Sequence, residues 1–313
     1  MAEPSNEDVL RWESRQGPRA AAAAAASAVL VIGSGIATAA VFNNAPTAGL
    51  LDSLERAGRP GGVGPLPSLR TPYYEFYDDR AGTVLLTALA RGIGFVAVAF
   101  MLVYLGLAVR NRSEGFRRMW IYVALAGGLL GAVATIMFTI GTSAEISTFV
   151  TGAHTVDRAA DIGDSSVLVT AQLIGIPGTQ AIGLASLALG LGWVVICLNA
   201  MRVGLLTRFM GVLGIICGAL IVLPILSPLP IVQTFWLGAM AMLLLGRWPN
   251  GVPPAWVTGE AQPWPSQQEA REARNAQRRG SEPDPEPDPE PVRPTGDARV
   301  HPSARKKKRK RRA

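Results

Sequence analysis

Arg91 is the only ionisable residue that lies well inside one of the long apolar segments of this chain. An unpaired charge at bilayer depth costs several kcal/mol, so such a residue is a functional candidate by default. If the surrounding helix ends at Val109, about 20 residues of hydrocarbon core reach back only to Ala90. Arg91 would then lie near the outer interface, where a long side chain can extend its charge to water. We favour such an anchor, supported by the aromatic and acidic run 73–79, over the alternative of a ligand- or ion-binding group.

The stretch 142–180 is the second candidate, because it begins acidic and then becomes polar before the next apolar segment. A continuous helix from Ser165 to Asn199 would exceed the bilayer thickness, and a break at Pro177 would resolve this. Unwound backbone at that depth often marks a transporter's substrate site. The favoured alternative is a helix that starts outside the bilayer and kinks at Pro177. The candidate ligand-binding residues are Arg91, Gln172, Pro177 and Gln180.

The histidines and cysteines of the chain exclude several kinds of membrane enzyme. His154 and His301 lie outside the apolar segments, whereas intramembrane haem ligation, zinc proteolysis and His-based serine proteolysis need imidazole at depth. Cys197 and Cys217 lie within apolar segments, so no disulfide framework is expected. Residues 33–35, Gly-Ser-Gly, are similar to the serine environment of some intramembrane proteases, but no span supplies a His or Lys base. We therefore expect no enzyme activity, no metal site and no cofactor.

The elements that would position these residues are transmembrane helices. Hydrophobic residues make up 49% of the chain and charged residues only 17%, against about a quarter charged in soluble proteins. Six apolar segments approach the roughly 20 residues that cross a bilayer. We expect an all-α six-helix transmembrane bundle over 20–246, a cytoplasmic N-terminus at 1–19 and a disordered tail at 247–313. The predicted spans are 20–42, 83–109, 119–141, 179–199, 209–226 and 231–246, the last two joined by a tight turn at 227–230.

Small residues at four-residue spacing indicate how these helices pack. Helices in lipid associate through close contact at Gly, Ala and Ser. We expect packing within one chain, with a homodimer face as the alternative. The pairs are Ala88 with Gly92, Ala90 with Gly94, Gly127 with Gly131, Ser186 with Gly190, Ala188 with Gly192 and Gly214 with Gly218.

Basic residues in the short loops predict the orientation, because cytoplasmic loops are enriched in Lys and Arg. Four arginines lie in 110–118 and two more at 202 and 208, whereas 142–167 has one arginine among four acidic residues. With an even number of spans, both termini lie in the cytoplasm.

The tail carries half of the Lys and Arg of the chain. The Pro-Asp-Pro-Glu repeat at 283–291 predicts an extended spacer. The basic run after it would bind anionic lipid at about 1 kcal/mol per residue, or another polyanion through phosphates; a specific partner, or a role only in topology and solubility, is the alternative. Without interleaved aromatic residues, sequence-specific nucleic-acid binding is not expected. The run comprises Arg305, Lys306, Lys307, Lys308, Arg309, Lys310, Arg311 and Arg312.

The segment 204–214, Gly-Leu-Leu-Thr-Arg-Phe-Met-Gly-Val-Leu-Gly, resembles a short cytoplasmic turn found in a large group of uncharacterised bacterial six-helix membrane proteins. The segments 246–249 and 253–256 are similar to those of a subset with basic tails. The resemblance covers about the last third of the membrane part. It implies a helical bundle in a bacterial plasma membrane, and it assigns no activity and no site residue.

These observations together predict a non-enzymatic multi-pass membrane protein whose basic tail contacts anionic lipid or another polyanion. The alternative is a small-solute transporter or permease that uses Arg91 and the segment 177–180. A transporter predicts a polar cavity near the bilayer midplane that reaches Arg91, Gln172 or Gln180.

Overall fold

The computed structural model of the chain describes residues 5–47, 54, 69–152, 178–223, 230–249 and 251–263, all within one compact unit. Among these residues every regular element is a helix, which confirms the all-α prediction. The expectations for Gln172, Pro177, residues 227–229 of the turn 227–230, the spacer 283–291 and the basic run 305–312 concern residues outside this part. The helices are α1 (Asn6–Phe42), α3 (Thr71–Asp78), α4 (Ala81–Arg110), α5 (Met119–Thr151), α7 (Gly178–Arg202), α8 (Arg208–Val222), α9 (Ile231–Leu244) and α10 (Pro254–Thr258).

Four of these helices are long and apolar enough to cross a membrane, namely α1, α4, α5 and the 180–202 part of α7. At about 1.5 Å per residue, helices of this length exceed the roughly 30 Å hydrocarbon core of a bilayer. With 15 and 14 residues, α8 and α9 are apolar but reach only about 21–22 Å. The part of the chain that the structure describes is therefore helical, with four candidate spans and two shorter apolar helices.

Two helices extend well beyond their predicted spans. Helix α1 begins at Asn6 rather than near residue 20, since the Ser5 side chain accepts a hydrogen bond from the Asp8 backbone N–H and caps the helix. Helix α5 continues past residue 141 to Thr151, and its late threonines bond back to the carbonyls four residues earlier. Hydropathy locates the hydrocarbon part of a helix, but its ends depend on caps and side-chain hydrogen bonds.

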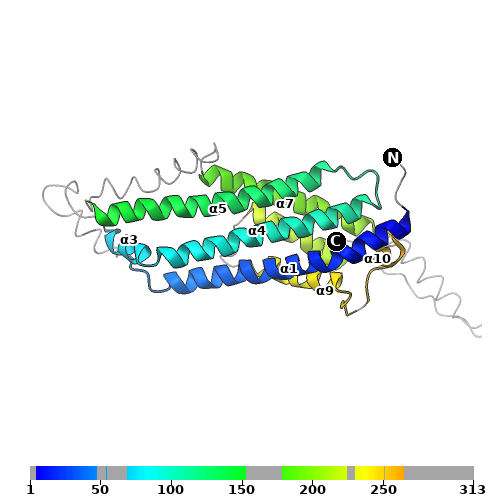
Figure 1. Cartoon of the computed structure of the whole chain (residues 1–313), viewed down its shortest axis with the longest axis horizontal. Coiled ribbons are helices and arrows are strands. Elements are labelled where there is room, and N and C mark those ends of the chain that lie inside the picture. The colour runs from blue at the N-terminus through cyan, green and yellow to red at the C-terminus, as the bar shows by residue number, and fades with distance from the viewer. Residues whose placement is uncertain are drawn as a thin grey trace, which may run out of the picture. The chain divides into compact units, whose positions relative to one another are not determined.

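Helices α1, α4 and α5 lie side by side along the long axis of the bundle (Figure 1). The six longest helices form a ring in which each helix contacts the next in chain order, and α9 returns against α1. Helix α4 also meets α7 across the ring. Small residues lie at these contacts: a Cβ added at Gly127 would collide with the backbone of Leu189, and one at Gly190 would lie 2.6 Å from the Gly218 carbonyl oxygen. The small-residue pairs thus bring helices of a single chain into backbone contact, as predicted.

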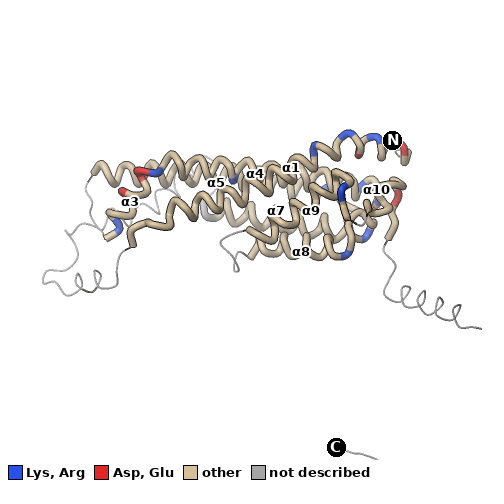
Figure 2. The backbone as a smooth tube through the Cα atoms, turned by 90° about the horizontal axis from the view of Figure 1, so that it is seen from below, with Lys and Arg blue, Asp and Glu red and all other residues tan. Residues whose placement is uncertain are grey.

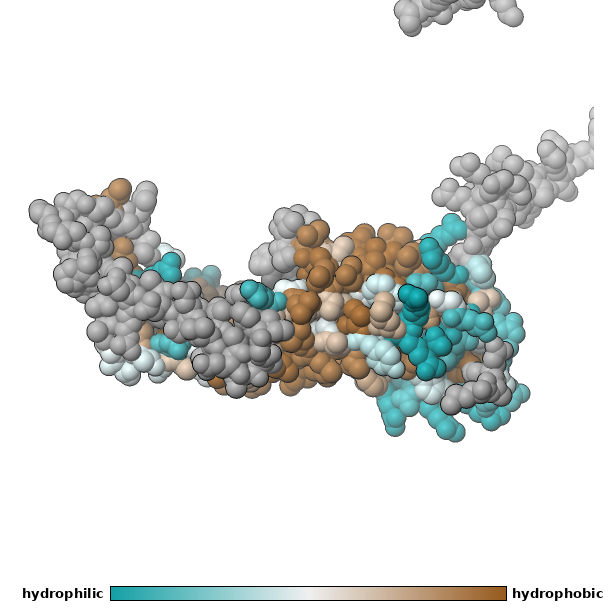
Figure 3. Space-filling view, turned by 90° about the horizontal axis from the view of Figure 1, so that it is seen from above, coloured by the Kyte–Doolittle hydropathy of each residue, from teal (hydrophilic) through white to brown (hydrophobic). Residues whose placement is uncertain are grey.

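Large apolar side chains cover the outer surface of the ring. Leu86, Ile93, Phe100, Leu187 and Phe235 are each between 43% and 65% exposed. Figure 3 shows hydrophobic residues over the middle of one face and hydrophilic residues where α10 lies. Lys, Arg, Asp and Glu gather towards the two ends of the ring (Figure 2). An apolar surface of this extent is suited to lipid.

The two ends of the ring differ in structure. At the α3 end, α3 packs on α5, and Tyr74, Tyr77, Ile146 and Phe149 form a small separate core. At the α10 end, the start of α1, the α4–α5 connection, the α7–α8 connection and residues 251–263 come together. Ordered structure therefore continues beyond Gly246, where we expected a disordered tail to begin, because residues 251–263 bond to the bundle.

Candidate functional site

The ring of helices contains a cavity of about 680 Å³. Its volume falls within the range of about 300–1,000 Å³ that is usual for small-molecule sites. Each of the six helices contributes to the wall, for example through Ser27, Arg91, Thr135, Ser186, Ile221 and Gln233.

The cavity exists because α8 and α9 are shorter than the other four helices. Val222, the last residue of α8, lies against Gly190 of α7. The residue before Gly190, Leu189, contacts Gly127 of α5, and the neighbouring Gly128 contacts Ala99 of α4. Helix α8 therefore ends near the level of Ala99. Helices α1, α4, α5 and α7 continue from there towards the α3 end and form the long walls of the cavity.

Arg91 lies in the part of the cavity nearest the α3 end. It is eight residues, or about 12 Å of helix, beyond Ala99. It is 19 residues, or about 29 Å, from Arg110 at the other end of α4. That distance matches the thickness of a hydrocarbon core. With Arg110 at one membrane surface, Arg91 would be near the level of the other.

The guanidinium group of Arg91 is half-buried and has no hydrogen bond or ion pair with any residue in the described part of the chain. The rest of the wall is mostly aliphatic and aromatic. The Ser27 hydroxyl is already bonded to the Gly94 carbonyl at 2.9 Å. An unpaired cation in surroundings of low dielectric attracts an anion more strongly than it would in water.

The other end of the cavity is closed by aromatic and aliphatic side chains. Trp193 and Leu237 line it, and both are almost fully buried. Trp193 packs against Trp236 with 4.9 Å between ring centroids, and the Trp236 indole N–H donates to the Met210 carbonyl. The cavity therefore has a cation at one end and aromatic and aliphatic side chains at the other, where the buried Trp193 indole N–H has no hydrogen-bond partner among the described residues.

The structure brings one of the four predicted ligand-binding residues into this cavity. Arg91 lines it, whereas Gln180 is exposed in the first turn of α7 and is not among the lining residues. Gln172 and Pro177 lie outside the described residues. The expected polar cavity at the midplane differs from the observed one, which is mostly apolar and has Arg91 near one end. The run 73–79 does not pair with Arg91, since about 15 Å of α4 separates α3 from it.

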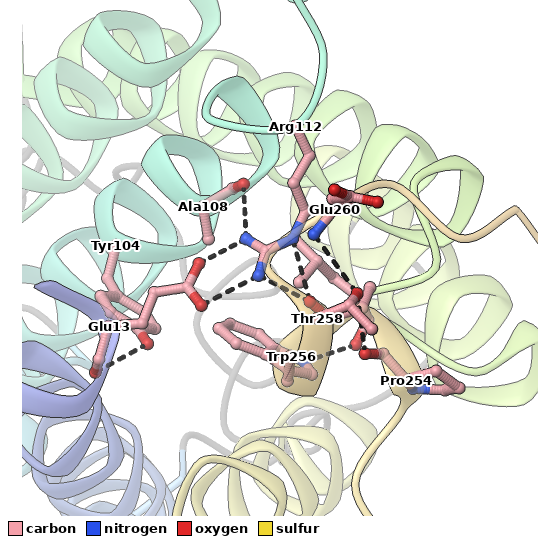
Figure 4. A network of polar contacts seen from close by, with 10 residues as sticks. Glu13, Tyr104, Ala108, Arg112, Pro254, Trp256, Thr258 and Glu260 are labelled. Carbon is pink, nitrogen blue, oxygen red and sulfur yellow. Dashed lines mark hydrogen bonds and ion pairs between the residues drawn. The ribbon is translucent and has the colours of Figure 1, made fainter. Parts of the chain in front are cut away.

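A second group of polar side chains lies at the α10 end, where the sequence predicted only loop charges (Figure 4). The Arg112 side chain is fully buried and forms an ion pair with Glu13, whose side chain is 6% exposed. One Nη2–Oε2 distance in this pair is 2.9 Å. Arg112 also donates to the carbonyls of Ala255 at 2.7 Å and Ala108 at 3.1 Å.

Aromatic rings complete this second group. Tyr104 stacks between Trp12 and Trp256, with ring centroids 5.3 and 6.0 Å away. The Trp256 indole N–H donates to the Leu205 carbonyl at 2.8 Å. We name this set of side chains the Arg112 cluster: Trp12, Glu13, Tyr104, Arg112 and Trp256. Because its charged groups pair with one another or with carbonyls, the cluster fastens segments together and leaves no cation free for a ligand.

Sequence reasoning missed this cluster because a loop arginine is normally solvated. The available signals were the acidic Glu13 beside Trp12 just before an apolar run, and Trp256 followed by Gly259. Gly259 has a φ of +74° and ends α10 in a left-handed conformation that favours glycine.

Among the described residues no group of three or more His, Cys, Asp or Glu side chains is arranged to hold a metal ion. Comparison of the chain with known protein families, curated proteins and solved structures gave no match.

Proposed function

We propose that this protein is a multi-pass membrane protein that binds a small solute inside its helix bundle, as a transporter or permease does. One observation carries the proposal: the guanidinium group of Arg91, which has no hydrogen-bond or ion-pair partner among the described residues, belongs to the wall of a cavity of about 680 Å³. The sequence had favoured an anchoring role for Arg91, with a transporter as the alternative. The cavity favours that alternative.

Stability considerations support a ligand role for Arg91. A charged side chain at the centre of a membrane helix costs about 2.5–3.5 kcal/mol on insertion scales, and less near an interface. An apolar residue at this position would avoid that cost. An interface anchor needs only a path to water, so it gives no reason for a cavity bounded by six helices. A bound anion would offset the cost of burying the guanidinium.

The proposed arrangement in the membrane has six crossings with both termini in the cytoplasm. Helices α8 and α9 are short, but they pack in the ring between α7 and α1 and expose large apolar residues such as Phe209, Ile216 and Phe235. Arginines are concentrated at the α10 end, as is usual for cytoplasmic loops. The resemblance of 204–214 suggests a bacterial plasma membrane. The arginines in or beside the α4–α5 and α7–α8 connections and just after α9 are Arg110, Arg112, Arg117, Arg118, Arg202, Arg208 and Arg247.

A second proposed activity is contact between the basic run 305–312 and anionic lipid or another polyanion. The concentration of arginines at the α10 end, where the described chain stops at Pro263, supports a cytoplasmic tail close to the bilayer surface. Deleting 305–312 should lower binding of the purified protein to vesicles containing anionic lipid. The difference should shrink as salt is raised. Equal binding at low salt by both proteins would contradict this activity.

The cavity proposal is tested by asking what the purified full-length protein retains. Gly131 lines the cavity, and an added Cβ there meets only ordinary contacts at 3.6 Å or more. The rest of a leucine side chain would occupy the cavity. Gly183 on α7 is exposed and has no atom within 4 Å of an added Cβ, so Gly183→Leu is the matched control.

Extraction and mass spectrometry of the purified proteins give the readout. We expect a small molecule that accompanies the wild type and Gly183→Leu but is depleted in Gly131→Leu. Identical profiles in all three folded proteins would overturn the proposal that the cavity binds a solute.

A further inference from the structure

The distribution of polarity along the cavity indicates the class of its ligand. Arg91 supplies a cation near the α3 end, and the opposite end, at Trp193 and Leu237, is buried and lined by an indole ring and an aliphatic side chain, with the Trp193 N–H as a lone polar atom without a partner among the described residues. The ligand that matches this arrangement is anionic at one end and apolar over the rest of its length.

Two other classes of ligand fit less well. A polar solute with several hydroxyl or ammonium groups would leave most of them unbonded against aliphatic walls, which is costly. A small inorganic anion would pair with Arg91 but leave most of the roughly 680 Å³ unfilled. Water takes about 30 Å³ per molecule and needs two to four polar partners. The walls provide few such partners.

We infer that the ligand is a single-chain anionic amphiphile, with its carboxylate or phosphate head at Arg91 and its hydrocarbon chain running towards Trp193 and Leu237. This inference rests on the proposed function, because it assigns a ligand to the same cavity. The lining residues on α7 extend from Ile182 to Trp193, which is eleven residues or about 16 Å of helix. The cavity is thus long enough to hold an extended chain rather than a compact solute.

The depth of Arg91 agrees with this orientation of the ligand. Arg91 is about 29 Å along α4 from Arg110, close to the thickness of the hydrocarbon core. An anionic head paired with Arg91 would therefore lie near the level of the lipid headgroups at the α3 end. The chain would point towards the membrane centre, in the direction of the acyl chains of that leaflet. An amphiphile would therefore keep the same orientation of head group and chain when it moves between the leaflet and the cavity.

The test uses the full-length protein in nanodiscs of zwitterionic lipid, with empty nanodiscs to measure partitioning into lipid. The labelled probe is dodecanoate, and the competitors are dodecyl phosphate, dodecanol and acetate. We expect saturable binding of dodecanoate above the empty-disc background. Both anionic amphiphiles should compete, and dodecanol and acetate should compete weakly. The relative strength of the two anionic competitors distinguishes a carboxylate from a phosphate head.

Variants locate the two ends of the ligand. Arg91→Gln should weaken dodecanoate binding about ten- to a hundredfold, since it removes a charge-assisted bond, and Arg91→Lys should retain most of it. Gly131→Leu should lower binding, and Gly183→Leu should not. Thermal unfolding of each variant checks whether it is folded. If the glutamine variant is unfolded, the role of the positive charge is tested by comparing dodecanoate binding of the lysine variant with that of the wild type.

Other results would contradict the inference, and they show whether the proposed function fails with it. If acetate competes as strongly as dodecyl phosphate, the cavity binds small anions and the amphiphile assignment is wrong. If dodecanol competes equally and Arg91→Gln has no effect, the cavity binds apolar chains and the role of Arg91 is wrong. In both cases a cavity ligand remains. If no probe binds and no compound is depleted by Gly131→Leu, both the inference and the proposed function are wrong.

Discussion

Glu13 and Arg112 are 99 residues apart in the sequence and form a buried ion pair with two hydrogen bonds. Glu13 belongs to the polar start of α1, and Arg112 follows the end of α4. The pair therefore joins the first helix of the ring to the α4–α5 connection. Through its bond to the Ala255 carbonyl, 143 residues away, Arg112 also holds the segment that follows α9.

Removing either partner of this pair should strongly destabilise the protein. Glu13→Gln or Arg112→Gln leaves the remaining charge buried without its partner, a change that costs about 3–5 kcal/mol. Differential scanning fluorimetry in detergent should show a clear drop in the unfolding midpoint for each. The control is Arg11→Gln, because the Arg11–Glu7 pair is 66% and 79% exposed and should contribute about 0–1 kcal/mol. A double variant that is no worse than either single variant would confirm coupling; additive losses would contradict it.

Gly204 should be intolerant of any side chain. Its φ is +79°, and an added Cβ would collide with the carbonyl of Gln262. The Gln262 backbone N–H donates to the Val203 carbonyl at 3.0 Å, so this contact fixes residues 251–263 on the α7–α8 connection. Gly204→Ala should destabilise by more than about 1 kcal/mol and release that segment.

Limited proteolysis provides the measurement for Gly204. We expect faster cleavage after residue 250 in Gly204→Ala than in the wild type, with the helices of the ring still protected. Gly115→Ala is a suitable control, because an added Cβ at Gly115 has no atom within 4 Å. Equal cleavage of Gly204→Ala and the wild type would show that the glycine is not needed there.

Hydropathy predicted the apolar helices because partition into a bilayer depends on composition within one segment. The expected spans 83–109 and 231–246 lie within two residues of the ends of α4 and α9. Small-residue spacing also predicted which faces come into contact, since close approach between helices requires a missing side chain at those positions. These features depend on residues near one another in the sequence.

The features that could not be predicted depend on contacts between distant residues. The burial of Arg112 requires Glu13 and the Ala255 carbonyl, which are distant in the sequence. The residues next to Arg112 are typical of a basic loop and do not indicate these partners. The cavity around Arg91 depends on α8 ending at Val222 rather than at the expected residue 226. Arg91 itself was a candidate from the sequence, because a charged residue within an apolar segment can be recognised without any knowledge of tertiary contacts.

The membrane orientation can be measured with single cysteines, because Cys197 and Cys217 are both buried. Gly115→Cys at the α10 end and Ala304→Cys in the tail should react with a membrane-impermeant maleimide only after the cells are permeabilised. Gly152→Cys, exposed at the α3 end, should react in intact cells. The wild type, with its two native thiols, gives the background. Labelling of Ala304→Cys in intact cells would contradict a cytoplasmic tail and the lipid contact proposed for it.

Replacing Arg91 with an uncharged residue should stabilise the ligand-free protein and remove its binding of the amphiphile. An unpaired charge costs free energy in the unliganded bundle, and methionine fills a similar volume without a charge. Arg91→Met should therefore raise the unfolding midpoint of the ligand-free protein, by an amount equivalent to roughly 1–3 kcal/mol. Adding dodecanoate should raise the midpoint of the wild type, because a ligand that binds the folded state stabilises it, and should leave Arg91→Met unchanged. A lower midpoint in Arg91→Met would instead identify Arg91 as a stabilising interface anchor, since the guanidinium would then contribute to folding without any ligand.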